Sequence, residues 1–163
     1  MTHVDTAKAK RRMLRFETLE EMLAEAERIT RAERAGKLKR LGNWSPGQAF
    51  GHLARWSDFA YEGYPPGARP PAVIRFMLRF MKKKFLNQGL PAGVRIPKVE
   101  GGTYGVERLT IDDGLDRLRR AVERLKKERA KFPSPAFGEM SREEQVALNL
   151  RHAELHLGFF EPE

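Results

Sequence analysis

Four stretches of this sequence begin with the signature of a helix N-terminus, and this feature constrains the fold more than any other. In each, a Ser or Thr is followed three residues later by an acid or an amide, the spacing of a capping box. The pairs are Thr18–Glu21, Ser45–Gln48, Thr110–Asp113 and Ser141–Glu144. Apolar residues then recur every three or four positions, as on the buried face of an amphipathic helix. The sequence therefore predicts four amphipathic helices: the first ends before Gly36, the second near Glu62 and the last near Phe160.

A fifth predicted helix, from about Ala72 to Asn87, has a different character. Apolar residues lie on one side of it and basic residues on another, and prolines come shortly before and after it. A Gly/Pro-rich loop, residues 88–109, leads to the next helix, and a loop of this length within a compact domain is often part of a site. No strand is predicted. The expected fold class is all-α: a four-helix bundle with a basic amphipathic helix inserted as an extra element.

The size of the chain and its charge fit one domain with basic regions. The sequence has 163 residues, of which 40% are apolar and 33% charged, so it can bury a core without disulfides. We expect a basic, flexible segment over residues 1–14 and one helical domain over residues 15–163.

The net charge of +9 is regional, because residues 1–15 carry +4 and residues 69–98 carry +8. A basic region can contact nucleic acid, a membrane surface or an acidic partner, or can simply be a solvated face.

Cysteine is absent from the sequence, which excludes disulfides, thiolate metal ligands and a thiol nucleophile supplied by the protein. The basic N-terminus is not followed by an apolar run, and no stretch is long and apolar enough to cross a bilayer. We therefore expect a cytoplasmic protein with no transmembrane segment.

The strongest sign of chemistry is a pair of histidines in the last predicted helix. His152 and His156 are four residues apart, so they stand one above the other on the same face. They share a narrow polar stripe with Gln145 and Asn149, and apolar residues flank this stripe on both sides. Two inward imidazoles can be satisfied by a shared metal ion or by hydrogen bonds to carbonyls or water. The charged residues of this helix fall on the opposite face and are expected in solvent: Glu143, Glu144, Arg151 and Glu154.

A third histidine lies on the apolar face of another predicted helix. In GNWSPGQAFGHLARW, His52 shares a face with Leu53 and Trp56. Three of the four histidines in the sequence thus point toward the core of the predicted bundle. Together they would form a three-imidazole site with an open position, the arrangement of a catalytic zinc centre. The fourth, His3, lies in the N-terminal segment and is expected to be unrelated to this site.

Three segments of the sequence resemble the DinB/YfiT-like superfamily, and most closely a branch of it without an assigned function. They are GNWSPGQAFGHLA, the Pro-Ala-Gly segment at residues 91–93, and FPSPAFGEMSREEQ followed by LNLRHAELHL. The similarity extends from about Arg11 to Pro162. It implies a four-helix bundle with an up-down-down-up course. It also implies a divalent metal ion, most often zinc or nickel, bound by His52, His152 and His156.

The resemblance also implies a reaction class. The superfamily is associated with metal-dependent hydrolases and thiol transferases that act on small molecules. In the transferases, the metal lowers the pKa of a low-molecular-weight thiol cosubstrate, which a chain without cysteine would need to receive from outside. The sequence offers no clear general base beside the metal. Gln48 and Asn149, each one turn before a histidine, are candidates for supporting the metal ligands or contacting the substrate.

A second function class stays open. The protein could be a non-catalytic, metal-stabilised binding module that contacts nucleic acid or an anionic surface through its basic N-terminus and inserted helix. No recognition-helix, RNA-recognition or zinc-finger pattern is present. The aromatic residues among the basic ones, Phe76, Phe80 and Phe85, are more simply packing groups than base-stacking platforms. A homodimer is also compatible with a bundle of this size.

Overall fold

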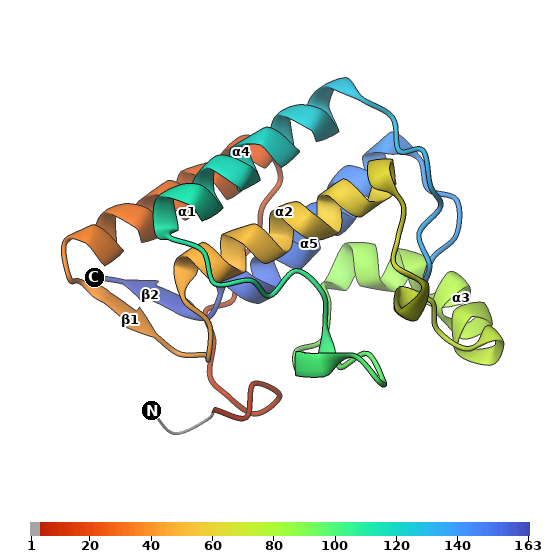
Figure 1. The fold of residues 1–163 in the computed structure, drawn as a ribbon, viewed down its shortest axis with the longest axis horizontal. Helices are drawn as coiled ribbons and strands as arrows, with labels where there is room; N and C mark the ends of the chain where they lie inside the picture. Colours follow the sequence, from red (N-terminus) through yellow and green to blue (C-terminus); the bar gives the residue numbers. More distant parts are fainter. Residues whose placement is uncertain (1–3) are drawn as a thin grey trace.

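The computed structural model describes residues 4–163, so His3 lies outside the described part of the chain (Figure 1). The described residues form five α-helices and a small two-stranded sheet, so the mostly helical prediction is confirmed. The helices are α1 (Leu19–Arg34), α2 (Pro46–Glu62), α3 (Ala72–Gln88), α4 (Ile111–Lys127) and α5 (Arg142–Leu157). The strands are β1 (Leu38–Arg40) and β2 (Phe160–Pro162).

Each of the four predicted N-caps begins a helix. Thr18 and Ser141 form complete capping boxes with the glutamates three residues on. At α2 only one half of the capping box forms: the Ser45 hydroxyl accepts a hydrogen bond from the backbone N–H of Gln48. The Gln48 side chain does not reciprocate, since its amide donates instead to the Val106 carbonyl at 2.9 Å. The start of α2 is therefore tied to the loop before α4.

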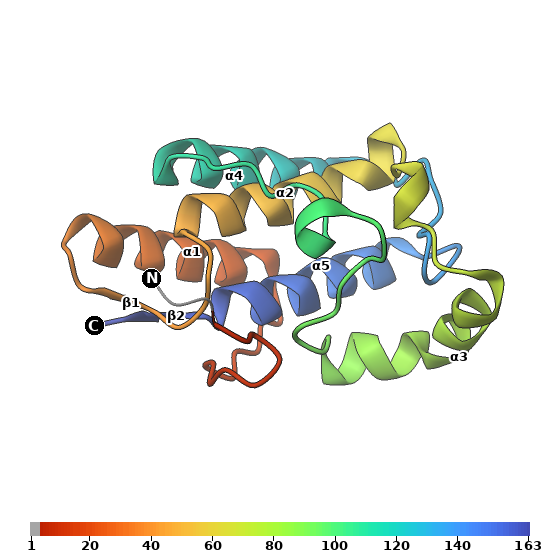
Figure 2. The ribbon, with the colours of Figure 1, turned by 60° about the horizontal axis from the view of Figure 1, so that its bottom comes forward.

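Helices α1, α2, α4 and α5 lie side by side around a shared core, and α3 lies outside this group (Figures 1 and 2). Helices α1 and α5 run in one direction, and α2 and α4 run in the other (Figure 1). Two glycines let α2 and α4 approach closely. A Cβ added to Gly114 of α4 would lie 2.4 Å from the carbonyl oxygen of Gly47 in α2, so a side chain there would force the helices apart.

The last helix ends earlier than predicted, and a strand follows it. Helix α5 stops at Leu157, and β2 pairs antiparallel with β1, placing Leu38 opposite Pro162. The expectation of no strand is therefore wrong. Each strand has only three residues, too few to show the alternation that identifies a strand in sequence. The sheet joins the segment after α1 to the end of the chain.

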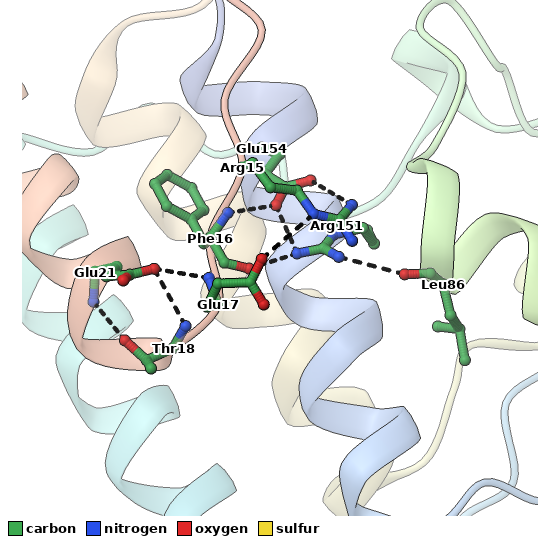
Figure 3. Close-up of polar contacts among 8 residues, drawn as sticks. All are labelled: Arg15, Phe16, Glu17, Thr18, Glu21, Leu86, Arg151 and Glu154. Atoms are coloured by element: carbon green, nitrogen blue, oxygen red, sulfur yellow. Dashed lines mark hydrogen bonds and ion pairs between the residues drawn. The ribbon is translucent and has the colours of Figure 1, made fainter.

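The charged face of α5 is not entirely in solvent, contrary to the prediction. Arg151 and Glu154 of this face form polar contacts with the segment before α1 (Figure 3). Arg151 and Glu154 are 4% and 5% exposed. The Glu154 carboxylate accepts from the Phe16 backbone N–H at 2.7 Å and from Arg151 at 2.6 Å. Arg151 also donates to the carbonyls of Phe16, at 2.5 Å, and of Leu86, at 3.3 Å. The helical wheel placed both residues opposite the histidines, but it could not show that the segment before α1 and the end of α3 cover that face.

Helix α3 packs against α5 at one end of the molecule (Figure 2). Lys82 of α3 pairs with Glu144 of α5 at 2.8 Å. No helix among the described residues has the length and apolar character needed to cross a membrane.

Candidate metal centre

Three imidazoles meet where α2 and α5 pack together. His52 comes from the second turn of α2, and His152 and His156 come from successive turns of α5. The Nε2 atom of His152 lies 3.2 Å from that of His52 and 3.1 Å from that of His156. Ligand atoms from all three lie within 4.8 Å of one another. Nitrogens bound tetrahedrally at about 2.0–2.1 Å from one zinc ion are about 3.3 Å apart, so this group could hold a metal ion.

The outer ring nitrogen of His52 has a partner in the loop before α4. Its Nδ1 lies 2.8 Å from the backbone oxygen of Tyr104. A carbonyl oxygen only accepts, so Nδ1 carries the proton and Nε2 presents its lone pair to the other imidazoles. The loop can come this close because Gly105 has a φ of 71° and no side chain, and a Cβ there would lie 2.9 Å from the Cβ of Arg55. Metal-binding histidines usually have such a partner, which orients the ring.

The pKa values of the three histidines favour the neutral form. Burial lowers the pKa of His52 from 6.5 to about 4. Burial also lowers the pKa values of His152 and His156 well below 6.5, and the neighbouring imidazoles lower them further. Neutral imidazoles are the form that binds a divalent cation.

The close nitrogen contacts are not fully satisfied by hydrogen bonds alone. The Nε2 of His152 faces two other Nε2 atoms, and that of His52 has no proton because its Nδ1 holds it. With neutral rings, only one of the two contacts can be a well-formed hydrogen bond. A cation among the three nitrogens would accept all three lone pairs. The donor set and its protonation therefore fit a metal ion.

We expect the metal-free protein to become less stable as the pH falls from 6.5 toward 4. In this window the unfolded chain binds protons at histidines that stay neutral in the folded state, so acid favours unfolding. The stabilisation is complete above pH 6.5 and is lost as the pH falls through the folded-state pKa values. For His52 alone, whose pKa drops from 6.5 to about 4, the loss is about 3 kcal/mol. Urea unfolding in the presence of a chelator, at a series of pH values, measures the free energy of unfolding of the metal-free protein. A free energy of unfolding that does not change between pH 6.5 and 5 would contradict this prediction.

A cavity of about 960 Å³ opens beside the imidazoles. Helices α2, α3 and α5 line it together with the loops at residues 90–103 and 134–137, and its walls are mostly apolar. His52 is buried, whereas His152 and His156 are partly exposed. Trp44 stacks on His156, with ring centroids 5.0 Å apart and planes within 9°. Among residues 4–163, Asp5 is the only carboxylate lining this space. The three-imidazole group therefore faces a partly open, mostly apolar volume of ligand size.

The two supporting residues predicted from the sequence lie in different places. Asn149 lines the cavity, and its amide donates to the Gln145 carbonyl at 2.9 Å, which leaves its oxygen available. Gln48 does not line the cavity; its bond to Val106 holds the loop that carries Tyr104. Trp44 and Tyr104, which contact His156 and His52, were not predicted as part of the site. The only signal for Tyr104 was the length of its loop, which marked the segment as a possible part of a site.

A mostly helical fold with three neutral imidazoles on the wall of an apolar cavity defines a candidate metalloprotein. In the comparison with protein families, one family model matches residues 8–163. The chain belongs to this family, DUF1569, described as a protein of unknown function. No curated protein and no solved structure matches the sequence.

Proposed function

We propose that this protein is a metal-dependent enzyme acting on a small molecule, with one divalent ion held by His52, His152 and His156. The convergence of their Nε2 atoms beside the cavity carries the proposal. The depressed pKa values, which keep the rings neutral, support it. Imidazole donors suit zinc and nickel among other first-row metals, and these two are the ions we expect.

The chemistry of such a site follows from its charge. Three neutral ligands leave the full charge of the ion uncompensated, and an ion with an open position lowers the pKa of a thiol or water that binds it. The residues of the chain hold and orient this centre. Tyr104 fixes the protonation of His52, and Trp44 stacks on one face of His156. The apolar walls of the cavity would hold the second reactant beside the ion.

Of the two reactions implied by the sequence resemblance, we favour transfer of a low-molecular-weight thiol to a small electrophile. A thiol needs only to be deprotonated to react, whereas hydrolysis usually also uses a general base near the water. Among the described residues that line the cavity, the one carboxylate belongs to Asp5 in the N-terminal segment. Space of about 960 Å³ is sufficient for a thiol and a small acceptor together.

We further propose that the fold is a DinB/YfiT-like four-helix bundle. The shared direction of α1 and α5, opposite to that of α2 and α4, supports this, because it is the order of an up-down-down-up course (Figure 1). The position of α3, between α2 and α4 in sequence and outside the four-helix group in space, fits an inserted element.

The function is tested on untagged protein, because a polyhistidine tag would itself bind metal. Protein loaded with zinc or nickel is assayed with a panel of thiols and a chromogenic electrophile, and in parallel with esters and amides without thiol. We expect thiol-dependent product formation that a chelator abolishes and added metal restores. We also expect the chelator to lower the melting temperature at neutral pH, because bound metal stabilises only the folded state.

The other outcomes of this assay are equally informative. Turnover of esters or amides without any thiol would make the protein a hydrolase. Metal-loaded protein that turns over no substrate in either panel would contradict an enzymatic role and leave the ion a structural one.

A further inference from the structure

Helix α3 carries an exposed apolar stripe. Val73, Phe76, Met77 and Phe80 are 74, 63, 53 and 76% exposed. Their spacing places them on one side of the helix. The rings of Phe76 and Phe80 pack edge to face, with centroids 4.8 Å apart. Five of the eight large apolar residues that are exposed in the described chain lie on this one helix, the fifth being Ile74. The stripe is therefore a local concentration of apolar surface and not the scatter found on most proteins.

Basic residues border this stripe. Arg79 and Lys83 lie along one edge and Lys84 lies at its C-terminal end, and all three are exposed. The region from residue 69 to residue 98 contains eight basic residues and no acidic one. Among residues 4–163, only one basic residue of α3 pairs with a carboxylate. This residue is Lys82, which lies on the inner side of the helix and pairs with Glu144 at 2.8 Å. Arg79, Lys83 and Lys84 therefore have no carboxylate partner among residues 4–163 and can contact a negatively charged partner outside the chain.

The opposite face of α3 belongs to the cavity. Leu78 and Phe85 line it, and Phe85 also contacts Phe137, with ring centroids 5.9 Å apart. Packing against α5 and the loop at residues 134–137 holds the helix in place, so the stripe faces away from the rest of the molecule. Figures 1 and 2 both show α3 at the periphery, beyond the four packed helices.

We propose that α3 docks this protein onto an anionic bilayer surface. A helix that lies in the plane of a membrane inserts its apolar face at the boundary between headgroups and acyl chains, while basic side chains contact anionic headgroups. Phe76 and Phe80 supply the first contact, and Arg79, Lys83 and Lys84 supply the second. This function is separate from the proposed metal chemistry and does not depend on it.

A bilayer fits this surface better than the other possible occupants. A two-fold dimer through α3 would place the same basic border near itself, with no acidic residue on the helix to compensate. Nucleic acid would match the basic residues, but its charged backbone would leave the apolar stripe without a partner. An anionic membrane provides apolar and negatively charged groups within a few ångströms of each other.

The test is co-sedimentation of the full chain with vesicles of phosphatidylcholine plus phosphatidylglycerol, and with vesicles of phosphatidylcholine alone. We expect binding to the anionic vesicles that weakens as salt is added. Changing Phe76 and Phe80 together to serine should reduce the partition coefficient by about tenfold or more. Reversing the charges of Arg79 and Lys83 should reduce it by at least about fivefold for each residue.

Two exposed positions outside α3 provide matched controls. Met13→Ser removes an apolar residue that is 84% exposed, and Lys131→Glu reverses an exposed charge. Both should bind as the unchanged protein does. Absence of binding, equal binding to both vesicle types, or equal loss in the controls would overturn the proposal. So would a dimer or a duplex DNA complex that depends on the α3 residues while vesicles remain unbound.

Discussion

Replacing His156 with alanine should lower the affinity for the divalent ion by more than about 100-fold. Replacing a residue that only hydrogen-bonds to a metal ligand lowers metal affinity by about 10- to 100-fold, and loss of the ligand itself should cost more. The variant removes one of three converging Nε2 atoms, and the two that remain, from His52 and His152, cannot complete the site. The metal-dependent rise in melting temperature should disappear with it. Metal analysis after equilibration in a buffered supply of zinc or nickel, with and without the substitution, measures the effect.

The matched control for this variant is Glu143→Gln on the same helix. Glu143 is exposed in the first turn of α5 and lies far along the helix from the histidines. Its replacement should leave metal content unchanged. If His156→Ala keeps its metal, the ion is bound elsewhere. If it loses metal but keeps catalytic turnover, the centre is structural and the proposed chemistry is wrong.

Replacing Glu154 with alanine should destabilise the protein by about 3–5 kcal/mol, the cost of breaking a buried ion pair from one side. The change removes the acceptor of two buried donors, the backbone N–H of Phe16 and the guanidinium of Arg151. Arg151 also joins α5 to the segment before α1 and to the end of α3, so its displacement would loosen all three (Figure 3). Urea unfolding of the metal-free proteins at neutral pH measures the difference.

Glu17→Ala is the control for this second variant. The Glu17 side chain is 77% exposed and, among residues 4–163, pairs only with Arg15, at 3.9 Å. Its loss should therefore change the free energy of unfolding by less than about 0.5 kcal/mol. The Glu154 variant, where it remains folded, should still bind metal, because Glu154 lies on the face of α5 away from the imidazoles. A loss smaller than about 1 kcal/mol would show that the buried contacts are replaced by water or by rearrangement.

The parts of the fold that the sequence could predict depend on interactions between residues close in the chain. The N-caps at Thr18 and Ser141 place helix starts correctly, because a capping side chain contacts a backbone N–H three residues on. The i, i+4 spacing of His152 and His156 fixes their relative position in the same way. Placing His52 near them needed one further inference, that apolar helix faces meet in the core, and the observed contact of 3.2 Å agrees with it.

The parts that could not be predicted depend on contacts between distant segments. The carbonyl of Tyr104 reaches His52 across 52 positions of the sequence, and nothing local to either residue marks that contact. The burial of Glu154 has the same origin, since its partner Phe16 is 138 positions away. The short sheet between β1 and β2 likewise joins the segment after α1 to the chain end. For Glu154, the helical wheel gave the direction of the side chain correctly but could not show which segment covers it.

X-ray absorption spectroscopy at the metal edge measures whether three imidazoles bind one divalent ion. Untagged protein with one equivalent of bound zinc or nickel provides the sample. We expect three imidazole nitrogens at about 2.0–2.1 Å from the metal, with the multiple-scattering pattern of histidine rings and at least one further light ligand. A coordination sphere with fewer than three imidazoles, or one made of oxygen ligands alone, would contradict it.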